Sequence, residues 1–85
     1  DVPYKSKKRG VMHACGHDAH TAILIGAGIL LKAIEPELNG RIKLIFQPAE
    51  ETDGGARDMI EYGCIDDACA IAGLHVDETI ATGII

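Results

Sequence analysis

The sequence predicts an α/β fold with parallel strands, and three features of its pattern support that prediction. A long apolar helix is expected first, over residues 18–34, and a β-rich run follows it. A second, almost continuous apolar run comes later, with a short helical segment between the two β-type runs. Strand, helix and strand in this order form a right-handed βαβ unit. The 85 residues therefore fit one small domain or a segment of a larger one.

The helix over residues 18–34 has signals at both ends. Asp18 is suited to the N-cap, and Pro36 lies just beyond the expected end. Apolar residues surround most of the helix, so we expect it to be buried on more than one side. Gly26 and Gly28 lower the helix propensity, and we expect another backbone to come close to them.

Two strands and a short helix are expected after this first helix. The run RIKLIFQ, residues 41–47, alternates in apolar character and ends at Pro48. The run ACAIAGLHV, residues 68–76, is apolar enough for a strand that is buried on both faces. Between them GGARDMIEYG, residues 54–63, predicts a helix that stops at Gly63. In open parallel sheets ligands bind beyond the carboxyl ends of the strands, so the residues at those ends are site candidates.

Five side chains with ligand or proton-transfer chemistry are expected to meet at that sheet edge. Glu50 and Glu51 follow the first strand, and His75 lies at the end of the second. If the loop with Cys15 and His17 enters its helix at the same edge, all five side chains converge there. Cys15 and His17 are two residues apart, so they can project to one side and chelate one metal or two neighbouring metals.

The two glutamates have two interpretations on local grounds. Neighbouring loop residues point in different directions, so one glutamate could bind a metal while the other faces the substrate pocket as a proton carrier in hydrolysis. Alternatively, the pair caps the next helix, because acidic side chains favour helix N-termini. The local sequence alone does not decide between these two roles.

The other polar residues of the MHACGHDAH stretch are weaker metal candidates. His13 and His17 are four residues apart, but they lack the glutamate of an H-E-x-x-H zinc helix, and Gly16 opposes a helix there. His20 and Asp18 are better suited to hydrogen bonds that orient a ligand residue. Asp18 could combine that role with helix capping.

Composition disfavours several other functions. A net charge of -5 with one Phe and two Tyr is unsuited to nucleic acid, so the basic cluster at residues 5–9 is expected to be a solvated loop. No apolar run is long enough to span a membrane and no signal-peptide pattern follows the N-terminus, which favours a cytoplasmic protein. Three cysteines without C-x-x-C or scaffold spacing indicate reduced thiols rather than redox chemistry, with Cys64 and Cys69 as small core residues.

Three linked motifs resemble one known family. MHACGHDAHTA, then KLIFQPAEE with GGARDMI, then AGLHV occur in this order in the two-metal amidohydrolases that cleave N-acyl amino acids. Aminoacylase-like enzymes, hippurate hydrolases and the hydrolases of auxin-amino acid conjugates are members, within a larger superfamily of two-metal exopeptidases. The resemblance extends from Gly10 to Val76.

The resemblance implies both a site and a reaction. Two divalent ions, zinc or manganese first and cobalt or nickel as alternatives, would be bound by Cys15, His17, Glu51 and His75. Glu50 would be the general base, which takes a proton from a metal-activated water and returns it to the leaving amine of an N-acyl amino acid. This assigns the glutamates to chemistry rather than to capping.

The resemblance also implies a larger protein. Its fold would be a three-layer α/β/α domain with a mostly parallel sheet, and residues 1–85 would be an internal segment of that catalytic domain. An inserted lid or dimerisation domain and a C-terminal part with a further ligand histidine would lie outside them. The parent is expected to form a homo-oligomer, and the segment by itself to be incomplete for catalysis.

A second hypothesis is a catalytically silent metal-binding module. Cys15, His17, Glu51 and His75 could close one tetrahedral site, which would leave no open position for a substrate. Metal stoichiometry measured together with hydrolysis of an N-acyl amino acid separates this module from the enzyme.

Overall fold

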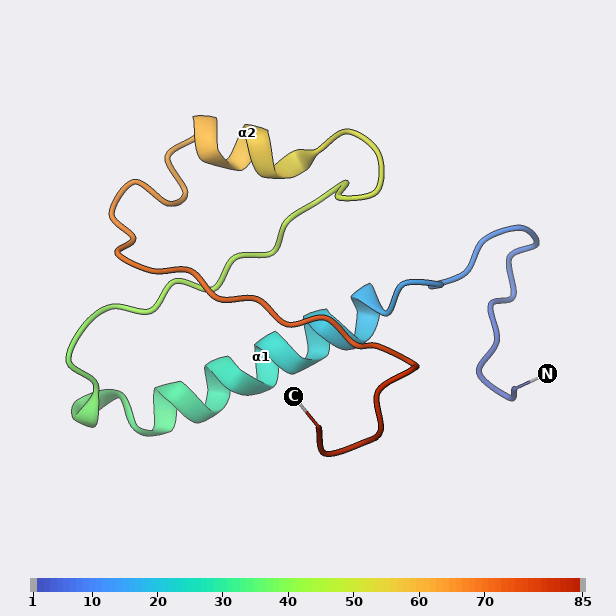
Figure 1. Ribbon diagram of the computed structural model, residues 1–85, viewed down its shortest axis with the longest axis horizontal. Helices are drawn as coiled ribbons and strands as arrows, with labels where there is room; N and C mark the ends of the chain where they lie inside the picture. The colour runs from blue at the N-terminus through green and yellow to red at the C-terminus, as the bar shows by residue number, and fades with distance from the viewer. Residues whose placement is uncertain (1, 85) are drawn as a thin grey trace.

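The computed structural model describes residues 2–84, which contain two α-helices and one short 3-10 helix (Figure 1). Helix α1 spans His17–Ala33, η1 spans Glu35–Glu37 and α2 spans Gly55–Glu61. Extended chain and turns connect them. Neither α-helix of this described part is long and apolar enough to cross a membrane.

Helix α1 confirms the predicted long helix but begins differently from the expectation. Its N-cap is Gly16 in the left-handed conformation, φ 74°, and no side chain caps it. Asp18 is therefore not the predicted cap; it lies in the first turn, where a carboxylate favours the positive end of the helix dipole. Only glycine adopts this φ without steric penalty, so Gly16 lets the preceding loop turn directly into the helix. The helix ends before Pro36, which lies within η1.

The surroundings of α1 also differ from the expectation. No side chain of the helix is buried, although its composition predicted burial on more than one side. A Cβ at Gly28 would lie 2.6 Å from Leu44 Cδ1, so a side chain rather than a backbone comes close there. Gly26 has open space around it. The exposed apolar side chains of α1 include Ile23, Ile25, Ile29 and Leu30.

Helix α2 confirms the short helix predicted within residues 54–63. Gly54 is its N-cap in the left-handed conformation, φ 65°. The helix ends at the C-cap Tyr62, and Gly63 follows with φ 76°. A left-handed glycine directly after the C-cap is the usual way to end a helix, so the predicted stop at Gly63 is confirmed.

The two predicted strands, residues 41–47 and 68–76, are extended but are not strands. They run in the same direction in Figure 1, in green and in orange to red, as parallel strands would. Between residues 2 and 84, however, no backbone ladder joins them and no residue is in a strand. A strand requires a neighbouring chain in register to pair its N–H and C=O groups. The predicted βαβ unit is therefore not formed within these residues, and the α/β fold stays a prediction.

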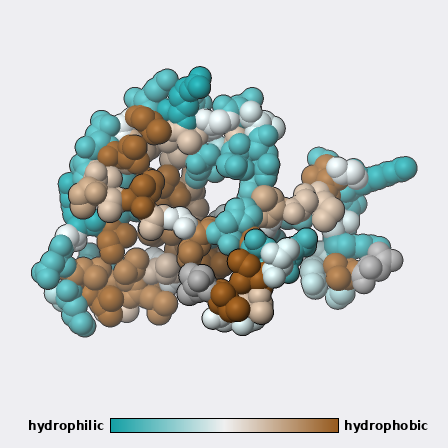
Figure 2. Space-filling view, viewed as in Figure 1, coloured by the Kyte–Doolittle hydropathy of each residue, from teal (hydrophilic) through white to brown (hydrophobic). Residues whose placement is uncertain are grey.

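The described residues enclose no hydrophobic core, because no apolar side chain from 2 to 84 is buried. The chain exposes 8041 Å², whereas a compact chain of this size would expose roughly 4,900 Å². Its radius of gyration of 16.0 Å likewise exceeds the value of about 12 Å for a compact domain of this length. Figure 2 shows brown apolar residues gathered over α1 and the extended segments. These faces are available to pack against further protein.

The cysteines show the same lack of a core. All three thiols are free, which agrees with the predicted reduced state. Cys64 is half-buried and Cys69 is exposed, so neither is the enclosed core residue that was expected. The basic loop at residues 5–9 is exposed, as predicted.

Candidate metal centre

The first turn of α1 contains His17 and His20, and Cys15 precedes it by one residue, Gly16. The left-handed turn at Gly16 places Cys15 just before the helix and His17 at its first position. The N–H of His20 donates to the Gly16 carbonyl at 2.9 Å, which closes the first helical turn. Residues three apart share a helix face, and the His17 and His20 ring centroids are 5.6 Å apart.

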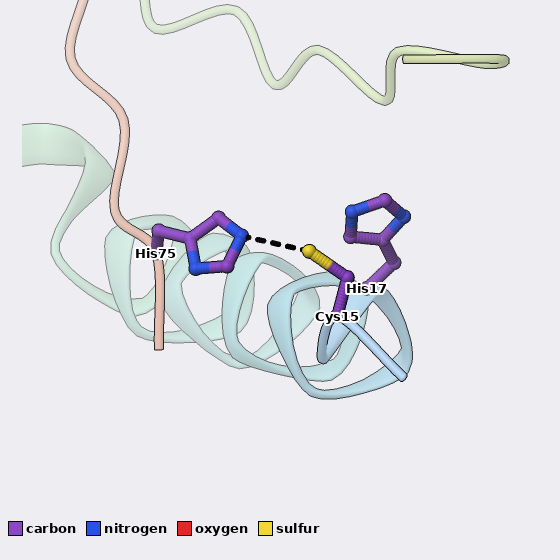
Figure 3. Close-up of side chains that lie close together, drawn as sticks. All are labelled: Cys15, His17 and His75. Atoms are coloured by element: carbon purple, nitrogen blue, oxygen red, sulfur yellow. Dashed lines mark hydrogen bonds between the residues drawn. The ribbon is translucent and has the colours of Figure 1, made fainter. Parts of the chain in front are cut away.

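The second extended segment brings His75 to this turn. His75 Nε2 lies 3.3 Å from Cys15 Sγ, although 60 positions separate the two residues (Figure 3). His75 Nδ1 is 2.6 Å from the Val76 carbonyl oxygen, and only a protonated ring nitrogen can donate to a carbonyl. The lone pair of His75 is therefore on Nε2, which faces the thiol. This is the tautomer that an imidazole requires to bind a metal through Nε2.

A tight loop after the first extended segment presents the two glutamates. Ala49 has φ 51° and is the only residue other than glycine with a positive φ among those described. Its carbonyl accepts the N–H groups of Thr52, Asp53 and Gly54 at 3.1 to 3.3 Å, so the loop is closed on itself. The loop also packs closely against α2, because Gly55 is buried with no room for a Cβ beside the Pro48 carbonyl.

His17 lies between the thiol side and the carboxylate side of the cluster. Its Nε2 is 3.5 Å from Glu51 Oε1 and 3.8 Å from Glu50 Oε2. Two donor groups share this histidine: Cys15, His17 and His75 form one, and His17, Glu50 and Glu51 the other, with the donor atoms of each within 4.8 Å of one another. Two donors bound to one zinc ion at about 2.0–2.3 Å are at most about 4.6 Å apart. The cluster therefore needs little rearrangement to hold a metal ion.

Electrostatics in the cluster also favour a cation. Side-chain interaction with the Glu51 carboxylate raises the pKa of the Cys15 thiol, and partial burial and the charges of Glu51 and Glu50 raise it further. A thiolate beside two carboxylates concentrates negative charge, which a divalent cation offsets. Sulfur, imidazole and carboxylate together form a donor set that suits a transition metal.

The two residues expected to orient ligands have different positions. His20 lies inside the cluster, where the Val76 N–H donates to its Nε2 at 3.0 Å. Partial burial, and then the neighbouring His75 and His17, lower the pKa of His20, which favours the neutral, accepting ring. Asp18 instead faces His13, with 3.9 Å between its Oδ1 and His13 Nδ1, and both side chains are largely exposed. The predicted orienting role of Asp18 requires a contact with a ligand histidine, and no described contact of this kind is present.

The structure thus brings together all five side chains that the sequence predicted to converge. They meet at the N-terminus of α1 and the ends of two extended segments, rather than at the edge of a formed sheet. Two contributors were missed at the sequence level. Gly16 opposes a helix in the sequence pattern, yet it is the N-cap of α1. The Val76 N–H is a backbone group, which leaves no signal in side-chain chemistry.

Comparison with known proteins gives a consistent family. The model of peptidase family M20/M25/M40 matches residues 1–85. N-acetyl-L-cysteine deacetylase of Bacillus subtilis is 54% identical over 82 residues, which cover 96% of this chain and 20% of that relative. IAA-amino acid hydrolase ILR1-like 4 of Arabidopsis thaliana is 55% identical over 80 residues, or 94% of this chain and 18% of the relative. A p-aminobenzoyl-glutamate hydrolase chain of Escherichia coli is 48% identical over 80 residues, again 94% of this chain and 18% of the relative.

The chain spans about a fifth of the length of these curated relatives. No solved structure matches it significantly. The match confirms the resemblance to N-acyl amino acid hydrolases that the three motifs indicated. Because the family model covers the whole sequence, the chain belongs to peptidase family M20/M25/M40.

Proposed function

We propose that the protein containing this chain is a metal-dependent hydrolase of the amide bond in N-acyl amino acids. The observation that carries the proposal is the convergence of a thiol, two imidazoles and two carboxylates from three separate segments. The names of the relatives support the substrate class. They specify an N-acetyl amino acid, an IAA-amino acid and p-aminobenzoyl-glutamate, each of which joins an acyl group to an amino acid.

In this proposal Cys15, His17, Glu51 and His75 hold two divalent ions. Zinc suits the thiolate and imidazoles, and manganese suits the carboxylates, with cobalt and nickel as alternatives. Bound there, the metal polarises the substrate carbonyl and lowers the pKa of water. The two donor groups that share His17 support a site for neighbouring ions.

Glu50 is the proton carrier of this proposal. Its carboxylate is largely exposed and lies 3.8 Å from His17 Nε2, slightly farther than the Glu51 carboxylate at 3.5 Å. Glu50 takes one proton from water as the water oxygen forms a bond to the amide carbonyl carbon. The C–N bond then breaks, and Glu50 returns the proton to the leaving amine. The products are the free acid and the amino acid.

We infer that residues 1–85 are a segment of the catalytic domain of a longer protein. The apolar faces of α1 and of the extended segments are exposed, and each extended segment has unpaired backbone groups among the described residues. Further strands and helices would cover both, as in a three-layer α/β/α domain. An inserted lid or dimerisation domain and a homo-oligomeric parent belong to the same proposal.

The decisive test is Glu50→Gln in the full-length protein. Turnover of an N-acyl amino acid should fall about 10²- to 10⁴-fold, because general-base catalysis contributes this much. Metal content should stay at the wild-type value, measured by elemental analysis after dialysis. Glu37→Gln, at an exposed glutamate in η1, is the matched control and should leave both quantities unchanged.

Two outcomes would contradict the proposal. Wild-type turnover in Glu50→Gln would remove the assigned base. A wild-type protein that binds one metal ion and hydrolyses no N-acyl amino acid would favour the closed metal-binding module instead.

A further inference from the structure

The backbone of Val76 connects helix α1 to His75. Its N–H donates to His20 Nε2 at 3.0 Å, and its carbonyl accepts the Nδ1–H of His75 at 2.6 Å. Both polar groups of this one residue are therefore engaged within the cluster. The first bond anchors the segment to α1, and the second sets the orientation of the imidazole that faces Cys15.

Packing reinforces this anchor. The Val76 side chain occupies the space where a Cβ on Gly16 would lie, and His20 Nε2 borders the same space at 3.5 Å. The first turn of α1 thus forms a packing site for Val76. Gly16 leaves the space because it has no side chain, and the His20 imidazole supplies the hydrogen-bond acceptor.

His20 is unsuited to bind a metal in this arrangement. The lone pair on its Nε2 already accepts the Val76 N–H, and the nitrogen is absent from both donor groups of the described residues. Its ring instead contacts that of His75, with centroids 4.3 Å apart and the planes at 66°. It touches a ligand candidate without being one.

We propose that His20 is a positioning residue: by holding the Val76 peptide it keeps His75 Nε2 directed at the metal site. The inference rests on the proposed function, since it assumes that His75 is a ligand. Hydrogen-bonding partners that orient ligand histidines are typically worth about 10- to 100-fold in metal affinity. We expect His20 to contribute a similar factor to metal affinity, although it acts on His75 only through the backbone of Val76.

Two amide variants of the full-length protein test the inference. His20→Gln places a carbonyl oxygen close to the position of Nε2 and can accept the Val76 N–H. His20→Asn has the same amide group, but its side chain is one bond shorter and does not reach. Cobalt(II) affinity is measured by chelator competition, and the thiolate-to-cobalt absorption band reports the site geometry. His13→Asn, at an exposed histidine outside the cluster, is the control.

We expect His20→Asn to lose about 10- to 100-fold in cobalt affinity with a changed absorption band, and His20→Gln to stay within a few-fold of wild type. Wild-type affinity in both variants would overturn the inference, and so would equal weakening of both. The readout needs only the metal, so the inference can fail while wild-type turnover persists. Conversely, if Glu50 is not the general base, the effect of His20 on cobalt affinity is still expected.

Discussion

The two extended segments, residues 41–47 and 68–76, differ in charge balance between their two ends. At the N-terminal end of both segments, the Asp67 carboxylate accepts hydrogen bonds from Arg41 at 2.9 Å and from Lys43 at 2.6 Å. Lys43 also donates to the Cys64 carbonyl at 2.9 Å. Here one carboxylate has two cationic partners from the same chain, so this end needs no external ion.

The end at the first turn of α1 has the opposite imbalance. A thiol and two carboxylates meet two imidazoles, with no lysine or arginine in the described contacts of the cluster. The pKa directions reflect the contrast: Lys43 lowers the pKa of Asp67, whereas Glu51 raises the pKa of Cys15. The comparison shows that one end joins the segments by internal ion pairs, while the other is built for a cation supplied from outside.

The largest expected effect is the loss of metal from Cys15→Ser in the full-length protein. Serine stays protonated at neutral pH, so the substitution removes an anionic ligand. Affinity should fall by more than the roughly 10- to 100-fold typical of an orienting residue. Elemental analysis after dialysis measures the metal. Cys69→Ser, at an exposed thiol, should retain it. Full metal content in Cys15→Ser would show that the charge imbalance at this end has another purpose.

An intermediate effect is expected for Gly16→Ala. The new Cβ would collide with Val76 Cγ2, and alanine at φ 74° is strained by about 1–2 kcal/mol before any clash. The free energy of unfolding of the full-length protein should fall by at least that amount, measured by urea titration. Gly26→Ala is the matched control, because its space is open and the helix favours alanine by up to about 1 kcal/mol. Equal changes in unfolding free energy for the two alanine variants would contradict the packing of Val76 against Gly16.

The smallest effect is expected for Asp67→Asn, because Arg41, Lys43 and Asp67 are all exposed and water screens their charges. The folded pKa of Asp67 is lowered, so the ionised carboxylate stabilises the protein above its unfolded pKa of about 3.8. That contribution disappears as the pH falls through the lowered folded value.

The difference in unfolding free energy between wild type and Asp67→Asn should therefore be present at neutral pH and vanish in strong acid. High salt should reduce it as well. Urea titrations at several pH values measure the difference, and Asp66→Asn serves as the neighbouring control. A difference that grows toward acid pH would reverse the sign and refute the role of the ion pairs.

The parts of the structure that depend on neighbouring residues were predictable. Helix α1 and helix α2 lie within one or two residues of their expected bounds, and Gly63 ends α2 as expected. Their signals are local: apolar spacing, good helix formers and a glycine stop. The Asp18 cap was wrong for a local reason too, because the glycine two positions earlier offered an alternative start.

Features that depend on distant partners were less accessible. Gly28 was correctly marked as a close approach, yet the contacting group is the Leu44 side chain rather than a backbone. The extended segments 41–47 and 68–76 have strand composition, but no described neighbour completes their hydrogen bonds. Composition indicates that a segment can form a strand, but the strand forms only when a neighbouring segment pairs with it in register.

By itself the sequence determined the helices, the family, and the set of five side chains expected to converge, because motif spacing and residue chemistry are properties of the linear chain. Only the tertiary structure decided which atoms meet: Cys15 Sγ with His75 Nε2, and His20 Nε2 with the Val76 N–H. These pairs are 60 and 56 positions apart. Their geometry depends on how the segments lie against the first turn of α1, and no local preference along the chain specifies that arrangement.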